Sequence, residues 1–304
     1  MIYQSIILGI SAAGISAGIY LKRRGVNFIM IGRDIGGELS LSGIVENYPG
    51  FLKINGLELA KKFKQHLDYY KISYFLETVE GIEKINHIFK VKTNKNYYES
   101  KSIIIATGTQ PKKLNIPGEK KFYHKGLSYC SVCDLPLFKN RIVAIVGGGN
   151  SALEAGLMAS DICKMAYIIN KNPKFKGDDI LINELNKKNN VKIIYNSLTK
   201  EIYGDKFVKG LKYLNTENNK LEELNIDGVF IHIGLKPNSE FIPNSWEIKN
   251  NFGEIVINEL GETKINGCFA AGDVTNIPYK QIGIAVGQGI IAALSNIKFL
   301  NNSS

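Results

Sequence analysis

The sequence predicts an α/β protein built from two Rossmann-like, dinucleotide-binding units. Two observations support this prediction. A short apolar run, a glycine turn and a small-residue helix occur in this order twice, at 5–24 and again at 141–160. Each copy is followed by alternating segments typical of a β-meander, at 73–100 and at 199–225. Because the plan repeats within 304 residues, we expect two domains of ordinary size.

The first copy opens with a buried-strand run at 5–9 and the turn Gly9-Ile10-Ser11-Ala12-Ala13-Gly14. Such a turn brings a pyrophosphate to the N-terminus of the following helix. Ser11 takes the place of the second glycine of the usual pattern. A second strand is expected at 27–31, where an acidic residue should follow and bind the ribose hydroxyl. Gly32-Arg33 follows instead, so we expect adenosine to be held in a different way.

The rest of the first unit alternates loops with regular elements. Gly36-Gly37-Glu38-Leu39 and 45–51 are predicted to be loops, and the apolar spacing at 56–70 predicts a helix. A buried strand at 102–106 ends in Thr107-Gly108, and a linker is expected at 111–117.

The second unit repeats this order around Gly147-Gly148-Gly149. Its predicted strands are 141–146, 165–169, 191–195 and 228–233, and its predicted helices run to Ser160 and over 178–189. The chain then crosses back at 234–243. It continues to Ala270-Ala271-Gly272-Asp273-Val274 and to a small-residue helix from about Ile282.

Tyr129-Cys130-Ser131-Val132-Cys133-Asp134 is the stretch most directly linked to chemistry. A Cys-x-x-Cys pair can be half of a zinc site, a redox disulfide or a chance occurrence. Structural zinc needs four ligands, whereas Cys163 and Cys268 stand alone and the four histidines are scattered, at His66, His87, His124 and His232. The pattern therefore favours redox chemistry, with no metal, and Asp134 can carry the proton that a cycling dithiol gains and loses. We expect Cys163 and Cys268 to be buried and unreactive.

Composition limits the class of protein and the partners. No apolar run approaches the ~20 residues that span a membrane, and no aromatic-and-basic cluster resembles a nucleic-acid module. We therefore expect a soluble protein that binds neither membrane nor nucleic acid. Only two of the four cysteines are paired in sequence, which favours a reducing cytoplasm. The net charge of +10 and the pI near 9.2 suit an acidic partner.

Taken together, these motifs resemble the low-molecular-weight thioredoxin reductases over nearly all of residues 3–297. The most specific elements are Cys130-Ser131-Val132-Cys133-Asp134, Val45-Glu46-Asn47-Tyr48-Pro49-Gly50-Phe51, Ala106-Thr107-Gly108-Thr109 and Ala271-Gly272-Asp273-Val274 with Gln281. The resemblance implies a discontinuous FAD-binding domain of residues 1–112 and 238–304. A pyridine-nucleotide-type domain, 113–237, would be inserted into it and carry the redox pair. It also implies a homodimer that passes electrons from flavin to the disulfide and on to thioredoxin.

The same resemblance assigns roles to residues. Cys133 would face the flavin, Cys130 would attack the thioredoxin disulfide, and Asp134 would move the proton. Asp273 would bond the ribityl chain rather than only cap a helix, and Asn47 would face the cofactor rather than only form a turn. The full set expected to contact FAD is Gly9, Ser11, Ala12, Ala13, Gly14, Gly32, Arg33, Gly37, Glu38, Leu39, Asn47, Ala106, Thr107, Gly108, Gly272, Asp273, Lys280, Gln281 and Ile282.

The inserted domain departs from the typical family pattern where NADPH binds. A His-Arg-Arg cluster and a further arginine usually grip the 2′-phosphate, and the matching positions here are Asn170, Lys171, Asn172 and Lys176. No arginine follows Arg141, and arginine suits phosphate better than lysine does.

In this respect the chain is similar to the ferredoxin-dependent flavin thioredoxin reductases, which lack the pyridine-nucleotide motifs. Ferredoxins are strongly acidic, so the surplus positive charge favours ferredoxin as donor. An NAD(P)H-driven reductase and a non-catalytic flavin redox sensor remain as alternatives. Related branches also carry a second flavin in the inserted domain.

Overall fold

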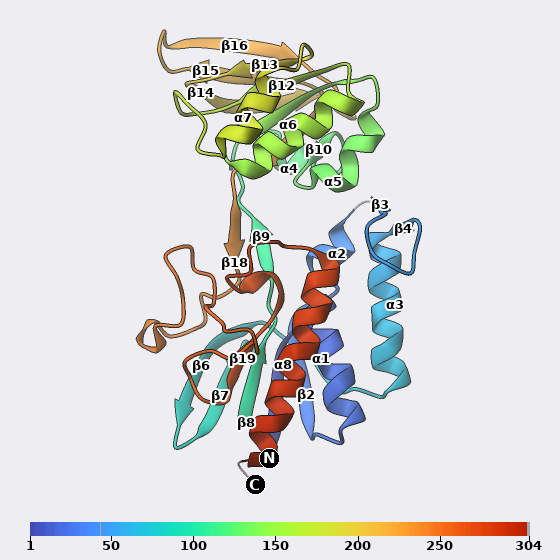
Figure 1. Cartoon of the computed structure of the whole chain (residues 1–304), viewed down its shortest axis with the longest axis vertical. Coiled ribbons are helices and arrows are strands. Elements are labelled where there is room, and N and C mark those ends of the chain that lie inside the picture. The colour runs from blue at the N-terminus through green and yellow to red at the C-terminus, as the bar shows by residue number, and fades with distance from the viewer. Residues whose placement is uncertain (43, 303–304) are drawn as a thin grey trace. The chain divides into compact units, whose positions relative to one another are not determined.

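The protein, analysed as a computed structural model, is described here over residues 1–42 and 44–302, and it divides into two compact units. Unit 1 contains Met1–Gln110 and Lys236–Ser304, and unit 2 contains Pro111–Leu235. The borders between these units lie at 110/111 and 235/236, and the expected FAD-binding domain has its borders at 112/113 and 237/238. The two connecting segments pair with each other as strands β9 (Thr109–Pro111) and β18 (Leu235–Pro237) (Figure 1).

Unit 1 is built on a sheet in the order β5-β2-β1-β8-β7-β6, with β19 also paired to β8. The parallel part contains β5 (Tyr74–Leu76), β2 (Phe28–Ile35), β1 (Ile2–Ile10), β8 (Tyr97–Ile105) and β19 (Cys268–Ala270). β6 (Val79–Ile85) and β7 (Ile88–Thr93) extend it in antiparallel fashion. The long helices of this unit are α1 (Ala12–Arg23), α3 (Gly56–Tyr69) and α8 (Ile282–Asn302).

The apolar run of β1 is buried on both faces of this sheet. Ile7 belongs to the core beneath α1 and α8, whereas Ile6 and Leu8 belong to the core on the opposite face. A strand covered on both sides reads as a continuous apolar run rather than an alternating one. The continuous apolar run in the sequence of β1 is thus explained by its burial in a core on each face of the sheet.

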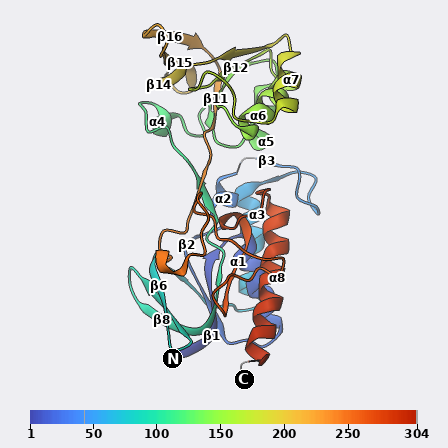
Figure 2. The ribbon, with the colours of Figure 1, turned by 60° about the vertical axis from the view of Figure 1, so that its left-hand side comes forward.

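Helices α1 and α8 lie side by side in both ribbon views (Figures 1 and 2). Their small residues permit this, since a Cβ on Gly289 would lie 2.1 Å from the carbonyl oxygen of Ala13. Among the described helices, α8 alone is long and apolar enough to cross a membrane by length and composition. Its buried residues include Ala285, Gly289, Ala292 and Ala293, and the three alanines belong to the same core as the buried residues of α1.

Unit 2 repeats the plan with a parallel sheet in the order β10-β17-β11-β12-β13. Helices α6 and α7 pack on one face, and the antiparallel strands β14, β15 and β16 lie toward the other (Figure 1). In unit 1, residues of β6 and β7 likewise pack over the sheet face opposite α1 and α8, so each unit has helices on one face and antiparallel strands toward the other. The predicted fold class is confirmed. The bounds are β10 (Leu127–Ser128), β11 (Ile142–Gly147), α6 (Asn150–Ile162), β12 (Met165–Ile169), α7 (Asp179–Asn186), β13 (Val191–Ile194), β14 (Ser197–Gly204), β15 (Val208–Asn215), β16 (Lys220–Asn225) and β17 (Gly228–His232).

Some local predictions were wrong. The segment at 74–76 was assigned to the first meander, but β5 pairs in parallel with β2. A loop was expected at 36–39, but α2 (Glu38–Leu41) forms a short helix there. The 45–51 stretch is bounded by a small hairpin of β3 (Ile44–Val45) and β4 (Ile54–Asn55). The remaining short elements are α4 (Glu119–Phe122), α5 (Ser131–Asp134), η1 (Leu135–Phe138), η2 (Asn244–Trp246) and η3 (Gly272–Val274).

Candidate functional site

The predicted redox pair forms a disulfide in unit 2. Cys130 and Cys133 are bonded, with their Cα atoms 5.4 Å apart. Strand β10 leads directly to Cys130, which caps the N-terminus of α5, and the backbone N–H of Cys133 lies 3.3 Å from Cys130 Sγ. A single turn of helix therefore brings two cysteines three apart into bonding distance.

Asp134 is tied to this turn through Ser128. The Ser128 hydroxyl donates to Asp134 Oδ2 at 2.6 Å, and the backbone N–H of Cys130 donates to Ser128 Oγ at 3.0 Å. Ser128 is buried. The carboxylate is thus held beside the disulfide by a serine that sequence reasoning did not single out.

His232 is a second residue that sequence reasoning missed. Its Nε2 atom lies 2.5 Å from Oγ of Ser131, the residue between Cys130 and Val132 in the turn. Burial lowers the pKa of His232 to about 4, so its imidazole is neutral at physiological pH. The available signal was topological, because His232 ends a buried strand, β17, that pairs with β10.

In unit 1, the first glycine turn permits very close packing of backbone. Gly9 has φ +113°, and a Cβ there would lie 2.1 Å from the carbonyl oxygen of Ala106. A Cβ on Gly14 would lie 2.0 Å from the carbonyl oxygen of Gly9. The ends of β1 and β8 and the first turn of α1 therefore meet at a point where only glycine fits, as a dinucleotide turn requires.

Strand β2 ends later than the predicted strand at 27–31. The strand continues past Gly32 to Ile35 and carries Asp34, two residues beyond the position where an acid was sought. Asp34 Oδ1 accepts a hydrogen bond from Gly37 N at 2.9 Å, and its carboxylate pairs with the exposed Arg33. Ser11 Oγ donates to the carbonyl oxygen of Gly36 at 2.5 Å.

Other predicted cofactor residues are brought together from distant parts of the chain. Asn47 Nδ2 donates to Gln281 Oε1 at 3.1 Å across 234 positions of sequence. Thr107 Oγ1 donates to the carbonyl oxygen of Asn238 at 2.7 Å. Of the remainder, Ala12 and Ala13 lie in the first turn of α1, Glu38 and Leu39 begin α2, Gly108 lies between β8 and β9, and Ile282 begins α8.

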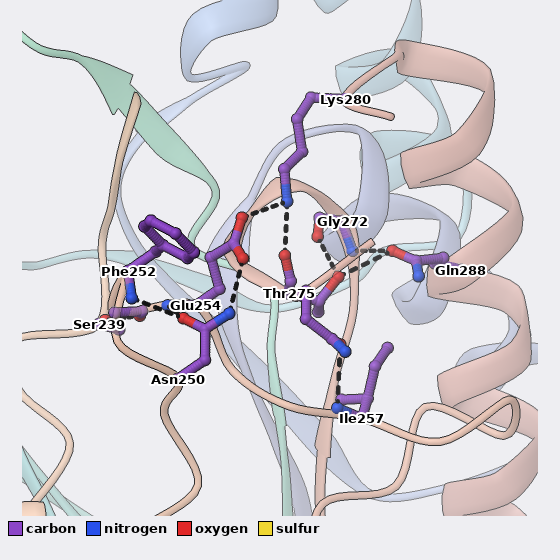
Figure 3. Close-up of polar contacts among 11 residues, drawn as sticks. Ser239, Asn250, Phe252, Glu254, Ile257, Gly272, Thr275, Lys280 and Gln288 are labelled. Carbon is purple, nitrogen blue, oxygen red and sulfur yellow. Dashed lines mark hydrogen bonds and ion pairs between the residues drawn. The ribbon is translucent and has the colours of Figure 1, made fainter. Parts of the chain in front are cut away.

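The Gly272 turn rests on a polar network that includes two unpredicted residues, Gln288 and Glu254 (Figure 3). Gln288 Oε1 accepts from the backbone N–H of Gly272 at 2.8 Å, and Thr275 Oγ1 donates to the Gly272 carbonyl at 2.8 Å. Lys280 Nζ donates to the Thr275 carbonyl at 2.5 Å and pairs with Glu254 at 3.1 Å. Lys280, which the sequence analysis expects to contact FAD, thus stabilises the turn that carries Asp273.

Asp273 lies on η3, directly after Gly272. Burial raises the pKa of its carboxyl, and the positive charge of Lys280 opposes that rise. Within residues 1–42 and 44–302, no group donates a hydrogen bond to its carboxylate. A partly buried carboxylate without a donor fits a hydroxyl-bearing cofactor such as FAD, whose ribityl chain offers several donors.

The two remaining cysteines are free and buried, as predicted. Burial raises the pKa of Cys163 to about 11 and that of Cys268 to about 12. Both thiols are therefore protonated and poor nucleophiles at physiological pH.

The profile of the pyridine nucleotide-disulphide oxidoreductase family matches residues 3–289. The chain belongs to this family. It is similar to a thioredoxin reductase of Ureaplasma parvum, with 37% identity over 305 residues that cover 100% of this chain and 98% of that protein. It is also 36% identical to an NADH dehydrogenase of Ferdinandcohnia aciditolerans, but it spans only 57% of that longer protein.

Solved structures give the same result. A thioredoxin reductase of Streptococcus pyogenes is similar with a TM-score of 0.88 and 31% identity, covering 99% of both chains. A ferredoxin-flavin thioredoxin reductase of Clostridium acetobutylicum has a TM-score of 0.54 and 32% identity, covering 99% of this chain and 98% of that one. The chain is a flavoprotein disulfide reductase of the thioredoxin reductase type, with FAD as its cofactor. These likenesses do not single out the ferredoxin-dependent branch.

Proposed function

We propose that this protein is a cytoplasmic, homodimeric thioredoxin reductase that draws its electrons from reduced ferredoxin. The observation that carries the reductase activity is the Cys130–Cys133 disulfide in a domain of dinucleotide type, joined to a domain whose Gly9, Gly14 and Asp273 fit FAD. The name of the Ureaplasma relative supports thioredoxin as the substrate.

Bound FAD, once it has received two electrons from two reduced ferredoxins, would supply the electron pair that reduces the disulfide. That reduction also takes up two protons, breaks the S–S bond and leaves two thiols. Cys130, as thiolate, then attacks one sulfur of the thioredoxin disulfide, which forms a mixed disulfide and releases a thioredoxin thiolate. Cys133 attacks Cys130 in turn, which restores the internal disulfide and releases reduced thioredoxin. Asp134, held by Ser128, moves the protons in this scheme.

We prefer ferredoxin as donor because the polar groups of unit 2 that would bind a nicotinamide dinucleotide are hydrogen-bonded to one another. The side chain of Asn170, at the end of β12, is buried; it donates to the Lys174 carbonyl at 3.0 Å and accepts from Asn172 N at 3.1 Å. The backbone N–H of Lys176 donates to the carbonyl of Gly148 at 2.8 Å. The 170–178 loop is thereby bound to the glycine turn.

The N-terminus of α6 carries a second internal contact. Asn150 Nδ2 donates to Asp178 Oδ2 at 2.9 Å, and Asp178 N donates to Asn150 Oδ1 at 2.8 Å. A carboxylate at this helix end disfavours a second anion such as a pyrophosphate. The ten surplus positive charges suit an acidic protein donor instead.

NADH is the second candidate donor, and Gly149 favours it. A Cβ there would meet no atom within 4 Å, so the backbone is open to a close-approaching phosphate. The 2′-phosphate of NADPH, for which arginines are missing, is absent from NADH. The similarity to an NADH dehydrogenase adds weight to this alternative.

Anaerobic mixing decides between the donors. The oxidised, FAD-loaded protein is mixed with NADPH, NADH or photoreduced ferredoxin while flavin absorbance is followed. We expect rapid bleaching with ferredoxin alone. Rapid bleaching by micromolar NADH or NADPH would reject ferredoxin as the preferred donor. Turnover of thioredoxin in the same assay separates an enzyme from a flavin redox sensor.

Gly149→Ala provides the matched variant for that experiment. Because the added methyl group meets no protein atom, it disturbs only a ligand that approaches the turn. We expect the variant to bleach with ferredoxin at the wild-type rate. A loss of bleaching by NADH in this variant alone would assign that nucleotide to the glycine turn.

A further inference from the structure

The contact between His232 and Ser131 has no role in the scheme above. Ser131 is the first residue of α5, directly after Cys130, and it is buried. His232 Nε2 lies 2.5 Å from its hydroxyl oxygen, and no other hydrogen bond is found for that hydroxyl among the described residues. Ser131 is the polar residue of the two between the cysteines, and the imidazole of His232 is the hydrogen-bond partner of its side chain.

His232 is itself fixed in place by the sheet. It is the last residue of β17, and its Cα is in register with Gly147 of β11. A Cβ built on Gly147 would lie 2.1 Å from the carbonyl oxygen of His232, so the two backbones are in close contact. Ser131 is therefore anchored to a rigid strand end rather than to a loop.

This contact is present together with the disulfide. Closing a disulfide within one turn of helix requires the backbone of that turn to hold both cysteines at bonding distance. Ser131 lies between them, so restraining its side chain restrains the turn. A buried hydroxyl without a partner is unfavourable, so a contact that is better formed in the disulfide form than in the dithiol form favours the disulfide.

We propose that His232 is a positioning residue that stabilises the disulfide form of the Cys130–Cys133 pair by holding Ser131. This inference rests on the redox function proposed above for the pair, and it extends that function to a residue in another strand. His232 acts through Ser131, the side chain that its ring contacts, rather than on either sulfur atom directly.

A redox titration tests the inference without donor or thioredoxin. The FAD-loaded protein is equilibrated in dithiothreitol buffers of graded reduced-to-oxidised ratio, quenched with acid and alkylated, and its dithiol fraction is measured. In His232→Phe and in Ser131→Ala we expect the equilibrium to move at least threefold toward the dithiol. That corresponds to a potential more positive by about 14 mV.

The double variant and a conservative one make the test specific. If His232 acts through Ser131, the double variant shifts no further than either single change, which shows coupling. His232→Gln, whose amide can reach Ser131, restores most of the wild-type potential. His66→Phe, on the exposed side of α3, leaves it unchanged.

The outcomes are distinguishable from failure of the proposed function. If the wild-type protein shows no dithiol at any buffer ratio, the redox assignment of the pair fails. If the pair titrates but His232→Phe leaves the potential unchanged or makes it more negative, the His232 inference fails. Additive shifts in the double variant also overturn it. Ser131→Ala removes one oxygen atom and keeps the test open should His232→Phe fold poorly.

Discussion

At the scale of single residues, we expect the Asp273 carboxylate to contribute most directly to FAD retention. The side chain is partly buried, and no group within the described part of the chain donates a hydrogen bond to it. Burial without a donor raises its pKa, and bound hydroxyl donors would lower it again. The residue is therefore incomplete without a ligand.

Asp273→Ala is expected to weaken FAD retention by about 10- to 100-fold, since a hydrogen bond to a charged group contributes about 1.5–3 kcal/mol. The dissociation constant can be measured by flavin fluorescence during dialysis. The exposed Asp205→Ala serves as control and should leave the constant unchanged. Equal retention in both variants would reduce Asp273 to a turn residue.

The four cysteines should separate cleanly by reactivity. Raised pKa values leave only about a thousandth of Cys163 as thiolate at pH 8, and less of Cys268. Alkylation of the folded, oxidised protein at pH 8 should therefore modify none of the four cysteines quickly. After reduction it should modify two, Cys130 and Cys133. Raising the pH toward 11 should speed modification of Cys163, because its thiolate fraction rises. Counting labels by mass spectrometry checks both statements.

Substituting either redox cysteine should abolish turnover with thioredoxin while leaving FAD bound. Cys133→Ser removes the resolving sulfur, so the mixed disulfide cannot be released, and Cys130→Ser removes the attacking one. Steady-state reduction of thioredoxin, with flavin content measured in parallel, gives the comparison. Cys163→Ser, a buried free thiol, is the control. Full activity in Cys133→Ser would refute the scheme.

Residues that touch close neighbours in sequence were predictable, and those with distant partners were not. The Cys-x-x-Cys spacing, together with the lack of further zinc ligands in the sequence, indicated a redox pair, and one helical turn produces it. Gln288 was missed because a glutamine within an apolar helix carries no sign that it accepts from Gly272. His232 was missed for the same reason, since its partner Ser131 lies 101 positions away.

At the scale of elements, α8 supports the cofactor turn as well as the core. Its small residues allow contact with α1, and its Gln288 side chain crosses to the Gly272 turn (Figure 3). Strands and helices with strong periodicity, such as β12 and α3, were predicted closely. β5 was misassigned because three residues cannot reveal which neighbour they pair with.

Gln288→Ala should loosen the Gly272 turn, because it leaves the partly buried Gly272 amide without its acceptor. We expect a loss of about 1–3 kcal/mol in unfolding free energy and faster FAD release. Thermal unfolding with and without added FAD measures both. Lys298→Ala, on the exposed side of the same helix, should change neither value. Unaltered FAD release in Gln288→Ala would show that the turn is held by Thr275 and Lys280 alone.

At the scale of the whole molecule, the repeated glycine turns predicted two domains, and the structure divides the chain into two units of the same layered plan. The donor is harder to infer from sequence. The missing arginines could be read directly, whereas the Asn150–Asp178 pair and the buried Asn170 emerge only when the 170–178 loop is folded onto the glycine turn. Charge remains the property of the molecule that most directly predicts its partner.

Electron transfer from an acidic donor should therefore weaken as salt rises. The screening length falls from about 30 Å at 0.01 M to about 8 Å at 0.15 M ionic strength, so attraction by the net charge of +10 is largely lost beyond contact. We expect the second-order rate of flavin bleaching by photoreduced ferredoxin to fall by about tenfold or more over this range. Reduction of the Cys130–Cys133 pair by dithiothreitol provides the control and should change far less, because its attacking thiolate carries a single charge. If the rate with ferredoxin also stays constant, electrostatic attraction does not contribute to the reaction. The charge-based reason for preferring ferredoxin over NADH then fails.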